Sequence, residues 1–502
     1  MSLQRAALRQ LERPLVRCIQ TSSRARPLAS TPFRAITSRP TCRSSRQTSR
    51  RGYATAIPAS DLEFGQPVYE THPHILKPGE ITPGITAQEY HDRRARLAES
   101  LPPGAVAILP AADLKYRSGA VFYPFRQESN FLYLTGFLES DAVAVIAKTG
   151  PLPSDFTFHL FCRPKDPAAE QWSGPWSGLR AALDVFNADE AHPIASLPSI
   201  LPKLLRAPTP PQIYTDLPPH HPLTPKLRLL LQSSSPLHPL HPTLHTHRAV
   251  KSPAEIAAMR HAGRISGRAL TDAMRRPWAT EHDLHAHLTH AFSQHGLSGP
   301  AYVPVIAGGR RGLGIHYVQN TAALPDPSET VLVDAGGEYG HYITDITRTW
   351  PLSGKFSAPQ RDLYAVVLAA QRAGVAQCRE DANVSLDDIQ RQTEGLLRRG
   401  LLDLGFDLGR DGLARLFPHH VGHYVGLDVH DVPGYSRGEV LKEGHCVTVE
   451  PGVYVPDEER WPRHFRGLAV RIEDSVCVGA DAPTVLTTEA VKEVVDIEAL
   501  RG

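Results

Sequence analysis

The sequence contains no run of eighteen consecutive apolar residues, which excludes a transmembrane helix. It also has no CxxC pair among its six cysteines. Cys18 and Cys42 lie near the N-terminus, and the other four are widely spaced: Cys162, Cys378, Cys446 and Cys477. This spacing argues against a cysteine zinc site and predicts reduced, mostly buried thiols.

Residues 1–53 contain no lysine and a single acidic residue, Glu12, but twelve arginines and many serines and threonines. This composition is typical of a mitochondrial transit peptide, and a basic arm that binds nucleic acid is the alternative. No apolar segment of signal-peptide type follows the first arginines, which excludes a secretory signal. Without these residues the formal net charge changes from +2 to −9, which argues against nucleic acid as a partner.

A length of 502 residues predicts two domains or more. Residues 54–85 are rich in proline and predict an extended arm. Residues 86–215 mix helix and strand patterns and predict a first α/β domain, in which a capping-box-like start at Thr86 predicts a helix through Ser100. Strands are predicted at residues 105–109, 131–137, 142–147 and 156–162.

Residues 202–247 contain ten prolines between Pro208 and Pro242, together with six histidines. This pattern predicts an irregular segment, with residues 216–247 as a linker or insertion between the domains. Such a histidine tract is compatible with adventitious binding of nickel or copper, but it lacks a fixed ligand geometry.

Residues 248–502 predict a second domain, again of α/β (α+β) class. Ser252, Pro253 and Glu255 supply an N-cap, a first-turn proline and a capping-box glutamate for a helix through Met274. Further helices are predicted at residues 280–295, 359–378, 386–404 and 489–500. Strands are predicted at residues 303–307, 331–334, 342–349, 446–450 and 468–478.

Residues 418–431 hold four histidines: His419, His420, His423 and His430. Gly422 and Gly426 disfavour a helix and predict an irregular strand whose backbone comes close to another segment. Neutral imidazole is the commonest metal ligand and the usual proton shuttle near pH 7. The alternative is a set of surface histidines, and carboxylates brought to this stretch would decide between the two.

Two aspartates flank a glycine-rich turn between two β-rich runs. A hairpin centred between Tyr339 and Gly340 places Asp334 directly across from Asp345. Two carboxylates held that close repel each other unless a cation lies between them.

Two glutamates lie in similarly apolar runs: Glu450 ends one predicted strand, and Glu473 lies on another. An ion pair between Glu473 and Arg471 is the structural alternative for one of them, since acids in a strand core are rarely buried unpaired. Four carboxylates and a histidine suit Mn²⁺, Co²⁺ or Zn²⁺. Two such ions about 3.5–4 Å apart would share Asp345 and Glu473 and activate one water between them.

The order of these residues resembles that of the dinuclear-metal peptidases of the pita-bread fold, and in particular the aminopeptidase P family. The resemblance rests on residues 419–431, 345–349 and 471–474, and on residues 126–137 in the first domain. His420 departs from the family pattern, because a small or polar residue is common there. Residues 418–424 are similar to the mitochondrial type-3, intermediate-cleaving branch of the family.

The resemblance implies an N-terminal aminopeptidase P-type α/β domain followed by a C-terminal pita-bread metallopeptidase domain. It implies two divalent metal ions, Mn²⁺ by family expectation with Co²⁺ or Zn²⁺ as alternatives, held by five ligands: Asp334, Asp345, His423, Glu450 and Glu473. The implied catalytic residues are Glu450, His430, His419, His316 and Arg471. Glu450 would be the general base, and His430 would steady the developing oxyanion. The other two histidines would line the substrate side, and Arg471 would orient the bridging carboxylate.

The implied activity is removal of a single residue of Tyr, Leu or Phe type from the N-termini of imported proteins after presequence cleavage. The enzyme would be mitochondrial, in the matrix or associated with the inner membrane, and would form a homo-oligomer, expected to be a dimer. The alternatives are a general Xaa-Pro aminopeptidase or dipeptidase, and a non-catalytic module that binds proteins. Residues 51–54, Arg-Gly-Tyr-Ala, lead to the hypothesis that the enzyme trims Tyr53 from its own precursor.

Overall fold

The computed structural model describes residues 63–206, 211–218, 220–231 and 236–501. The predicted presequence, residues 1–53, and the self-processing site at Tyr53 lie outside these residues. Within the described part of the predicted arm, β1 (Glu80–Thr82) and β2 (Ile85–Thr86) form a short antiparallel pair. All described residues belong to one compact unit.

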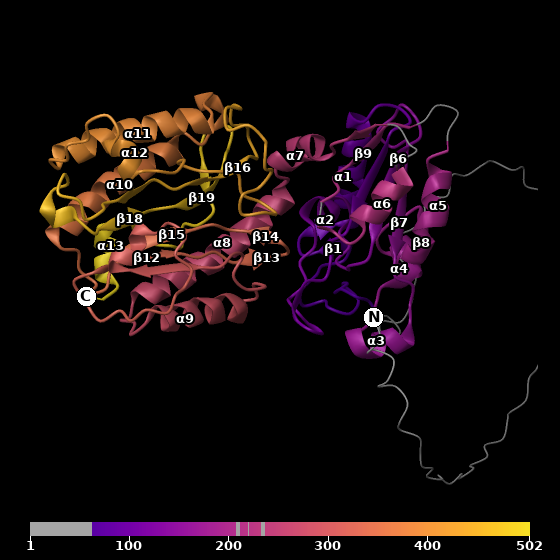
Figure 1. Cartoon of the computed structure of the whole chain (residues 1–502), viewed down its shortest axis with the longest axis horizontal. Helices are drawn as coiled ribbons and strands as arrows, with labels where there is room; N and C mark the ends of the chain where they lie inside the picture. Colours follow the sequence, from indigo (N-terminus) through magenta and orange to yellow (C-terminus); the bar gives the residue numbers. More distant parts are fainter. Residues whose placement is uncertain (1–62, 207–210, 219, 232–235, 502) are drawn as a thin grey trace, which may run out of the picture. The chain divides into compact units, whose positions relative to one another are not determined.

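A six-stranded mixed sheet organises the first half of the described chain. Its strand order is β10 (Leu237–His238), β9 (Ile213–Thr215), β3 (Val106–Pro110), β6 (Val143–Lys148), β7 (Phe156–Cys162) and β8 (Glu190–Pro193). The central strands β3, β6 and β7 are antiparallel, and the pairs outside them are parallel. Helices α1 (Ala87–Ser100) and α2 (Ser129–Thr135) cover one face, and α5 (Leu197–Leu204) and α6 (Thr224–Leu231) cover the other (Figure 1).

The predicted strand at residues 131–137 is wrong, because most of this segment forms the helix α2. The Glu128 carboxylate accepts a hydrogen bond from the Phe131 amide at 2.6 Å and caps the helix start. Gly136 ends the helix with a φ of +66°. All seven helical residues are buried, so core packing and these two caps outweigh the strand propensity of an aromatic-rich sequence.

The predicted irregular structure at residues 202–247 is also wrong. This stretch contains β9, α6, β10 and the start of α7 (His241–Ala249), and β10 completes the sheet by pairing in parallel with β9. Pro225 and Pro242 are each the second residue of a helix, where a missing backbone N–H costs no helical hydrogen bond. The predicted boundary at residue 216 stays a prediction.

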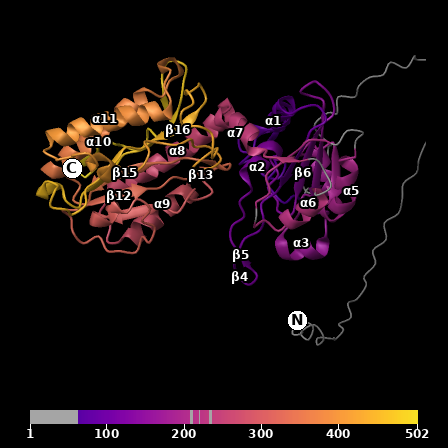
Figure 2. The same cartoon turned by 45° about the horizontal axis from the view of Figure 1, so that its top comes forward.

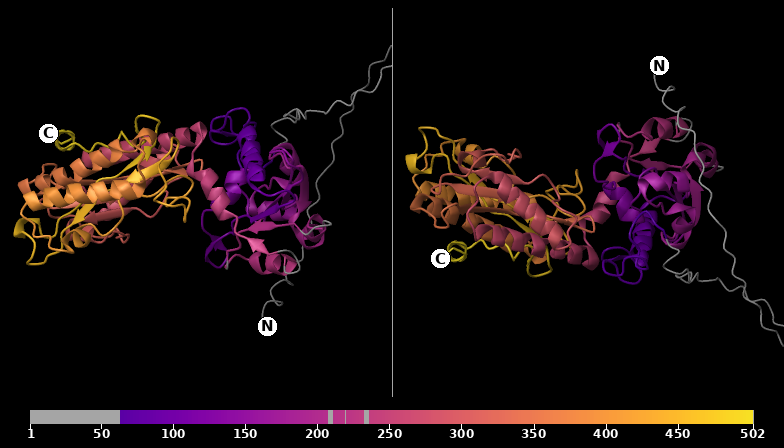
Figure 3. Two further views of the ribbon diagram at one scale, coloured as in Figure 1. Left: turned by 90° about the horizontal axis from the view of Figure 1, so that it is seen from above. Right: turned by 90° about the horizontal axis from the view of Figure 1, so that it is seen from below.

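The second half of the described chain places short sheets between two helix pairs. Helices α8 (Pro253–Met274) and α9 (Glu281–Gln294) lie on one side, and α10 (Ala358–Ala376) and α11 (Leu386–Asp403) lie on the other (Figure 1). Figure 3 shows α10 and α11 running side by side. The predicted bounds of these four helices are confirmed within two residues, and α8 carries its predicted capping box. The closing helix α13 (Val494–Ala499) is shorter than predicted.

The sheets of this half are built from short strands. One contains β11 (Val305–Gly308), β12 (Thr330–Asp334) and β15 (Thr347–Pro351), and another contains β16 (Cys446–Val449), β19 (Asp474–Cys477) and β20 (Thr484–Val485). Two strands predicted as continuous are interrupted: β14 (Tyr342–Ile343) is separated from β15, and β18 (Ala469–Arg471) from β19. Asp345 and Glu473 lie in these gaps. The interruptions free their side chains from the strict alternation of a strand.

A hairpin projects from the first half, formed by β4 (Tyr116–Ser118) and β5 (Val121–Phe122) (Figure 2). In the ranges that the structure describes, no helix has both the length and the apolar character needed to cross a membrane. The four cysteines in these ranges are buried and unpaired, as predicted.

Candidate metal centre

The histidine stretch, residues 418–431, lies alongside strand β16 without forming a regular strand of its own. The Glu450 amide donates to the Val421 carbonyl at 2.7 Å, and the Thr448 amide donates to the His423 carbonyl at 2.8 Å. A Cβ atom at Gly422 would lie 2.0 Å from the Thr448 carbonyl oxygen, so only glycine permits this approach. The predicted close backbone approach is therefore present, although only a single bridge, at Tyr424, replaces the predicted strand.

The five predicted metal ligands come from five separate segments and line one cavity of about 910 Å³: Asp334, Asp345, His423, Glu450 and Glu473. We call them the central cluster. The same cavity is lined by the four other predicted site residues: His316, His419, His430 and Arg471. The structure thus brings all nine predicted residues together.

The hairpin that carries the two aspartates has a different register from the predicted one. β13 (Glu338–Tyr339) pairs with β14 so that Gly340 and His341 form the turn, and both have positive φ values, of 56° and 69°. Asp334 therefore lies across from Thr347 and not from Asp345. The prediction is wrong because the turn lies one residue further along the chain, which moves the residue opposite Asp334 by two positions.

Tyr302 joins the two aspartates instead. Its hydroxyl lies 2.7 Å from Asp334 Oδ1 and 2.6 Å from Asp345 Oδ1. Burial, followed by the charges of these carboxylates, raises the pKa of Tyr302 well above its usual value, so the phenol keeps its proton. The sequence contains no motif for Tyr302, because it lies in a loop before β11, and the pairing of β11 with β12 brings it to the aspartates.

His423 is oriented as a metal ligand requires. Its Nδ1 lies 3.0 Å from the Tyr424 carbonyl oxygen and must donate to it, so Nε2 is the nitrogen that faces the carboxylates and could bind a metal. That Nε2 lies 3.5 Å from Asp345 Oδ2 and 3.5 Å from Glu450 Oε1. Burial alone lowers the pKa of His423, but its hydrogen bond with Asp345 and the nearby carboxylate charges outweigh burial and raise it to about 9.

The carboxylates of the central cluster cannot all carry a charge without compensation. Burial and neighbouring carboxylates raise the pKa of Glu450 to about 7, although His423 and Arg471 oppose the shift. Burial is also the main cause that raises the pKa of Asp334 to about 6 and that of Glu473 well above its usual value. Divalent cations would supply the missing positive charge, and oxygen-rich donors with one imidazole are the ligands such cations accept. The residues present therefore fit a metal centre.

Arg471 compensates part of this charge from one side. Its guanidinium donates to Asp334 Oδ2 at 2.6 Å and to Thr347 Oγ1 at 2.9 Å. The Thr347 hydroxyl in turn donates to Glu473 Oε2 at 2.6 Å. The ion pair with Glu473 that we considered as an alternative is replaced by an ion pair with Asp334, and Arg471 reaches Glu473 only through Thr347.

The remaining histidines of the stretch differ in their partners. His419 donates from Nδ1 to the His420 carbonyl and accepts from the Tyr454 hydroxyl, both at 2.9 Å, and burial lowers its pKa to about 4. The His430 ring lies perpendicular to the His423 ring, with centroids 4.4 Å apart, and forms no hydrogen bond with other residues that the structure describes. His420 bonds to the Gly422 carbonyl and to Asp387 of α11, which gives this unassigned residue a structural role.

A buried ion network anchors the end of the stretch. Asp431 accepts from Lys251 Nζ at 2.9 Å and from Arg248, and Arg248 also donates to Asn130 at 2.6 Å. Although burial opposes it, the charges of Lys251 and Arg248 lower the pKa of Asp431 to about 2. The motif at residues 126–137, in the first half of the chain, therefore contacts the histidine stretch through Arg248. The sequence did not predict this contact.

Comparisons with known proteins match both halves of the chain. Residues 257–480 match the model of metallopeptidase family M24, and residues 90–214 match the aminopeptidase P, N-terminal domain. Intermediate cleaving peptidase 55 of Saccharomyces cerevisiae is 42% identical over 454 residues, 87% of this chain and 88% of the relative. Xaa-Pro aminopeptidase 3 of Mus musculus is 38% identical over 87% of this chain and 90% of the relative.

A mitochondrial intermediate cleaving peptidase 55 of Arabidopsis thaliana is 35% identical, over 90% of each chain. Among solved structures, Icp55 of Saccharomyces cerevisiae superposes with a TM-score of 0.80 at 41% identity, covering 84% of this chain and 99% of that one. The similarity therefore includes both halves of the chain and the loops that carry the central cluster.

Proposed function

The chain belongs to metallopeptidase family M24, and from that premise we propose that it removes a single residue from the N-termini of mitochondrial proteins. It has an aminopeptidase P N-terminal domain followed by an M24 domain of pita-bread fold, and it is a mitochondrial metalloaminopeptidase that uses divalent metal ions. The observation that carries the proposal is the meeting of four carboxylates and His423 in one cavity. A non-catalytic module is not favoured, because all five expected metal ligands are present and line the cavity.

The proposed cofactor is a pair of divalent ions, with Mn²⁺ as the expected metal, held by Asp334, Asp345, His423, Glu450 and Glu473. When bound, such ions polarise a peptide carbonyl and lower the pKa of water. Asp345 and Glu473 lie in strand interruptions close to His423, so the two carboxylates would be the ligands that both ions could share.

Glu450 is the proposed general base. Its carboxylate lies at the end of β16 and faces the cavity, where the Thr448 hydroxyl and His423 Nε2 each lie 3.5 Å from Oε1. These long contacts leave the carboxylate oxygens available to take a proton from water and to pass it to the leaving amine.

The proposed substrate side is formed by three histidines: His316, His419 and His430. His430 is the proposed donor to the carbonyl oxygen, because its ring nitrogens are not engaged by the described part of the protein. His419 is fixed between a carbonyl and Tyr454, so it is proposed to shape the pocket as a neutral ring. Arg471 is the proposed positioning residue for Asp334 and, through Thr347, for Glu473.

Substitution of Glu450 tests this mechanism. Glu450→Gln keeps the size of the side chain but removes the base, so we expect kcat to fall by more than about 10²-fold while circular dichroism and unfolding stay near the parent values. Glu439→Gln, an exposed glutamate in the loop after the histidine stretch, is the matched control and should retain full activity. An active Glu450→Gln variant would contradict the assigned role.

A second candidate specificity, cleavage before proline, is favoured by the relatives named Xaa-Pro aminopeptidase. Metal-loaded enzyme should be given two matched peptide sets, one with Tyr, Leu or Phe followed by Ala or Ser, and one with Xaa-Pro at the start. Preference for the first set supports trimming of imported proteins. Strict dependence on proline would show instead that the enzyme is an Xaa-Pro aminopeptidase. The predicted dimer is tested on the same sample by light scattering.

A further inference from the structure

A second group of metal-ligand side chains lies in the first half of the chain, at the edge of its six-stranded sheet. It consists of His159 on β7 and of Glu190 and His192 on β8, and we call it the edge cluster. β7 and β8 run parallel with His159 in register with Glu190, and Phe161 in register with His192. Because alternate residues share one face of a strand, the three side chains of the edge cluster lie on the same face.

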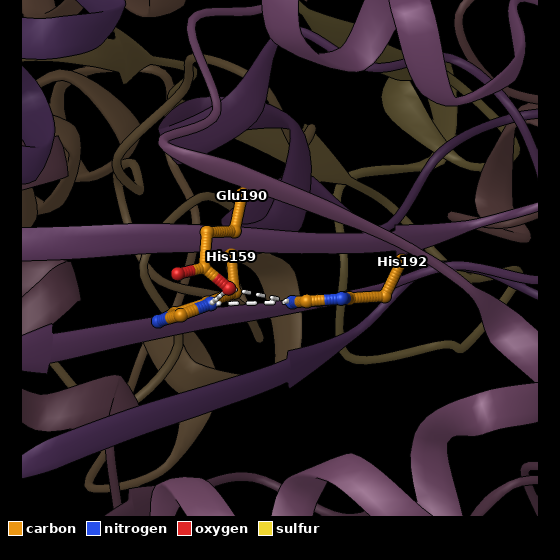
Figure 4. Close-up of side chains that lie close together, drawn as sticks. All are labelled: His159, Glu190 and His192. Carbon is orange, nitrogen blue, oxygen red and sulfur yellow. Dashed lines mark hydrogen bonds and ion pairs between the residues drawn. The ribbon is translucent and has the colours of Figure 1, made fainter.

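The donor atoms of the edge cluster lie close to one another. His159 Nδ1 and His192 Nε2 are 3.4 Å apart, and Glu190 Oε2 lies 3.6 Å from the first and 3.4 Å from the second. Figure 4 shows the two imidazole edges facing each other, with the carboxylate closing the third side. A tetrahedral ion with bonds of about 2.0–2.2 Å holds its ligand atoms about 3.3–3.6 Å apart. The three donors are thus spaced as the ligands of a tetrahedral ion are.

The electrostatic surroundings also suit a cation. His159 is buried, and burial lowers its pKa, so its ring is neutral and offers a lone pair near pH 7. The Glu190 side chain is 59% exposed and, among the described residues, forms ion-pair contacts only with these two histidines. No lysine or arginine of the described chain therefore competes for the carboxylate, and the exposed side gives an ion access from solvent.

The neighbouring acid does not belong to the group. The Asp189 carboxylate accepts a hydrogen bond from the Phe158 amide at 2.8 Å, which turns it toward the β7 backbone. The edge cluster consequently offers three protein ligands and one open position, the arrangement of zinc sites that retain a water.

We propose that the edge cluster binds one Zn²⁺ ion, which fastens the edge strand β8 to β7. Two imidazoles and one carboxylate bind zinc in preference to Mn²⁺, because affinity of nitrogen-rich sites rises along the divalent series. The central cluster has four carboxylates and one imidazole. The protein therefore carries two sites of different metal preference, and the edge site is not part of the hydrolytic centre.

The test measures the zinc content of the intact protein without its predicted presequence. The parent, His192→Asn and Glu190→Gln are each dialysed against buffered Zn²⁺ at micromolar free concentration, and the number of zinc ions per chain is then determined. We expect each variant to hold one zinc ion fewer than the parent. Glu190 is exposed, so Glu190→Gln should fold like the parent. This variant therefore tests the site even if His192→Asn fails to fold.

His241→Asn is the matched control, since His241 contacts Asp216 Oδ1 at 2.8 Å but belongs to no group of three side chains with metal-ligand spacing in the described chain. This control should hold as much zinc as the parent. Zinc should also raise the unfolding temperature of the parent and the control by about 2–4 °C more than that of the two edge variants. Equal zinc content in all four proteins, or filling only at millimolar zinc, would overturn the proposal.

Discussion

The central cluster and the edge cluster use similar side chains but are built in opposite ways. The edge cluster takes its ligands from two neighbouring strands, and one pairing register is enough to align them. The central cluster takes its five ligands from a hairpin, the histidine stretch and the ends of two further strands, spread over residues 334–473. A ligand set on adjacent strands depends on local pairing, whereas the central cluster exists only when both helix pairs and the short sheets are in place.

The two clusters also differ in charge. In the central cluster, burial and neighbouring carboxylates raise the pKa of Glu450 and of Glu473, so a cation would relieve a repulsion that already exists. The edge cluster has one carboxylate, which is partly in solvent and has no second carboxylate among the ligands beside it. Metal removal should therefore affect activity through the central cluster and mainly local stability through the edge cluster.

The largest expected effect is at a bridging position of the central cluster. Glu473→Gln removes one of its charges while keeping side-chain size, and we expect kcat/KM to fall by more than about 10³-fold together with the bound metal. Metal analysis and peptide hydrolysis measure both. Glu281→Gln, which changes a fully buried glutamate outside the cavity, should keep its metal. Full metal content and activity in Glu473→Gln would contradict the assignment of the central cluster as the catalytic metal site.

An intermediate effect is expected at Tyr302. Tyr302→Phe deletes the hydroxyl that contacts both aspartates, and loss of such a supporting hydrogen bond costs about 10–100-fold in metal affinity or activity. Metal titration followed by kinetics gives the measurement. Tyr317→Phe is the control, since the Tyr317 hydroxyl donates to a glutamate outside the cavity at 2.8 Å. An unchanged metal affinity would mean that Tyr302 only fills space.

The buried network behind the histidine stretch predicts a pH-dependent stability. Asp431 has a folded pKa of about 2, below its usual value of about 3.9. Its stabilisation is therefore complete above about pH 4 and is lost as the pH falls through 2.

Asp431→Asn leaves Arg248 and Lys251 without their buried carboxylate and should cost about 3–5 kcal/mol in the free energy of unfolding at pH 7. Urea unfolding of parent and variant from pH 7 to pH 2 should show a constant difference above about pH 4 and a shrinking difference below it. Asp428→Asn, at a more exposed partner of Arg248, should cost less. A difference that does not change with pH would contradict the assignment.

The smallest effect on catalysis is expected at the edge cluster. Glu190→Gln should leave kcat/KM within about two-fold of the parent, because the site lies outside the catalytic cavity. Hydrolysis of the preferred peptide at saturating Mn²⁺ provides the measurement. A loss of activity comparable with that of Tyr302→Phe would show that the two clusters are coupled.

Several elements followed directly from local sequence. Ser252, Pro253 and Glu255 predicted the start of α8 correctly, since an N-cap, a proline and a capping box act within one turn. The strand at 131–137 was predicted wrongly because the caps at Glu128 and Gly136 and the burial of the whole segment stabilise a helix there. Residues 202–247 were predicted as irregular because the parallel partner of β10 lies more than twenty residues away.

The sequence alone determined the members of the central cluster, because carboxylates and a histidine in apolar runs have few other uses and their order matches a family. The tertiary structure decided how they meet. It set the hairpin register that places Asp334 opposite Thr347, and it brought in Tyr302, which has no signal in the sequence. It also aligned His159 with Glu190 and His192. These contacts join residues distant in the chain, so their geometry depends on strand pairing and packing that local propensity does not encode.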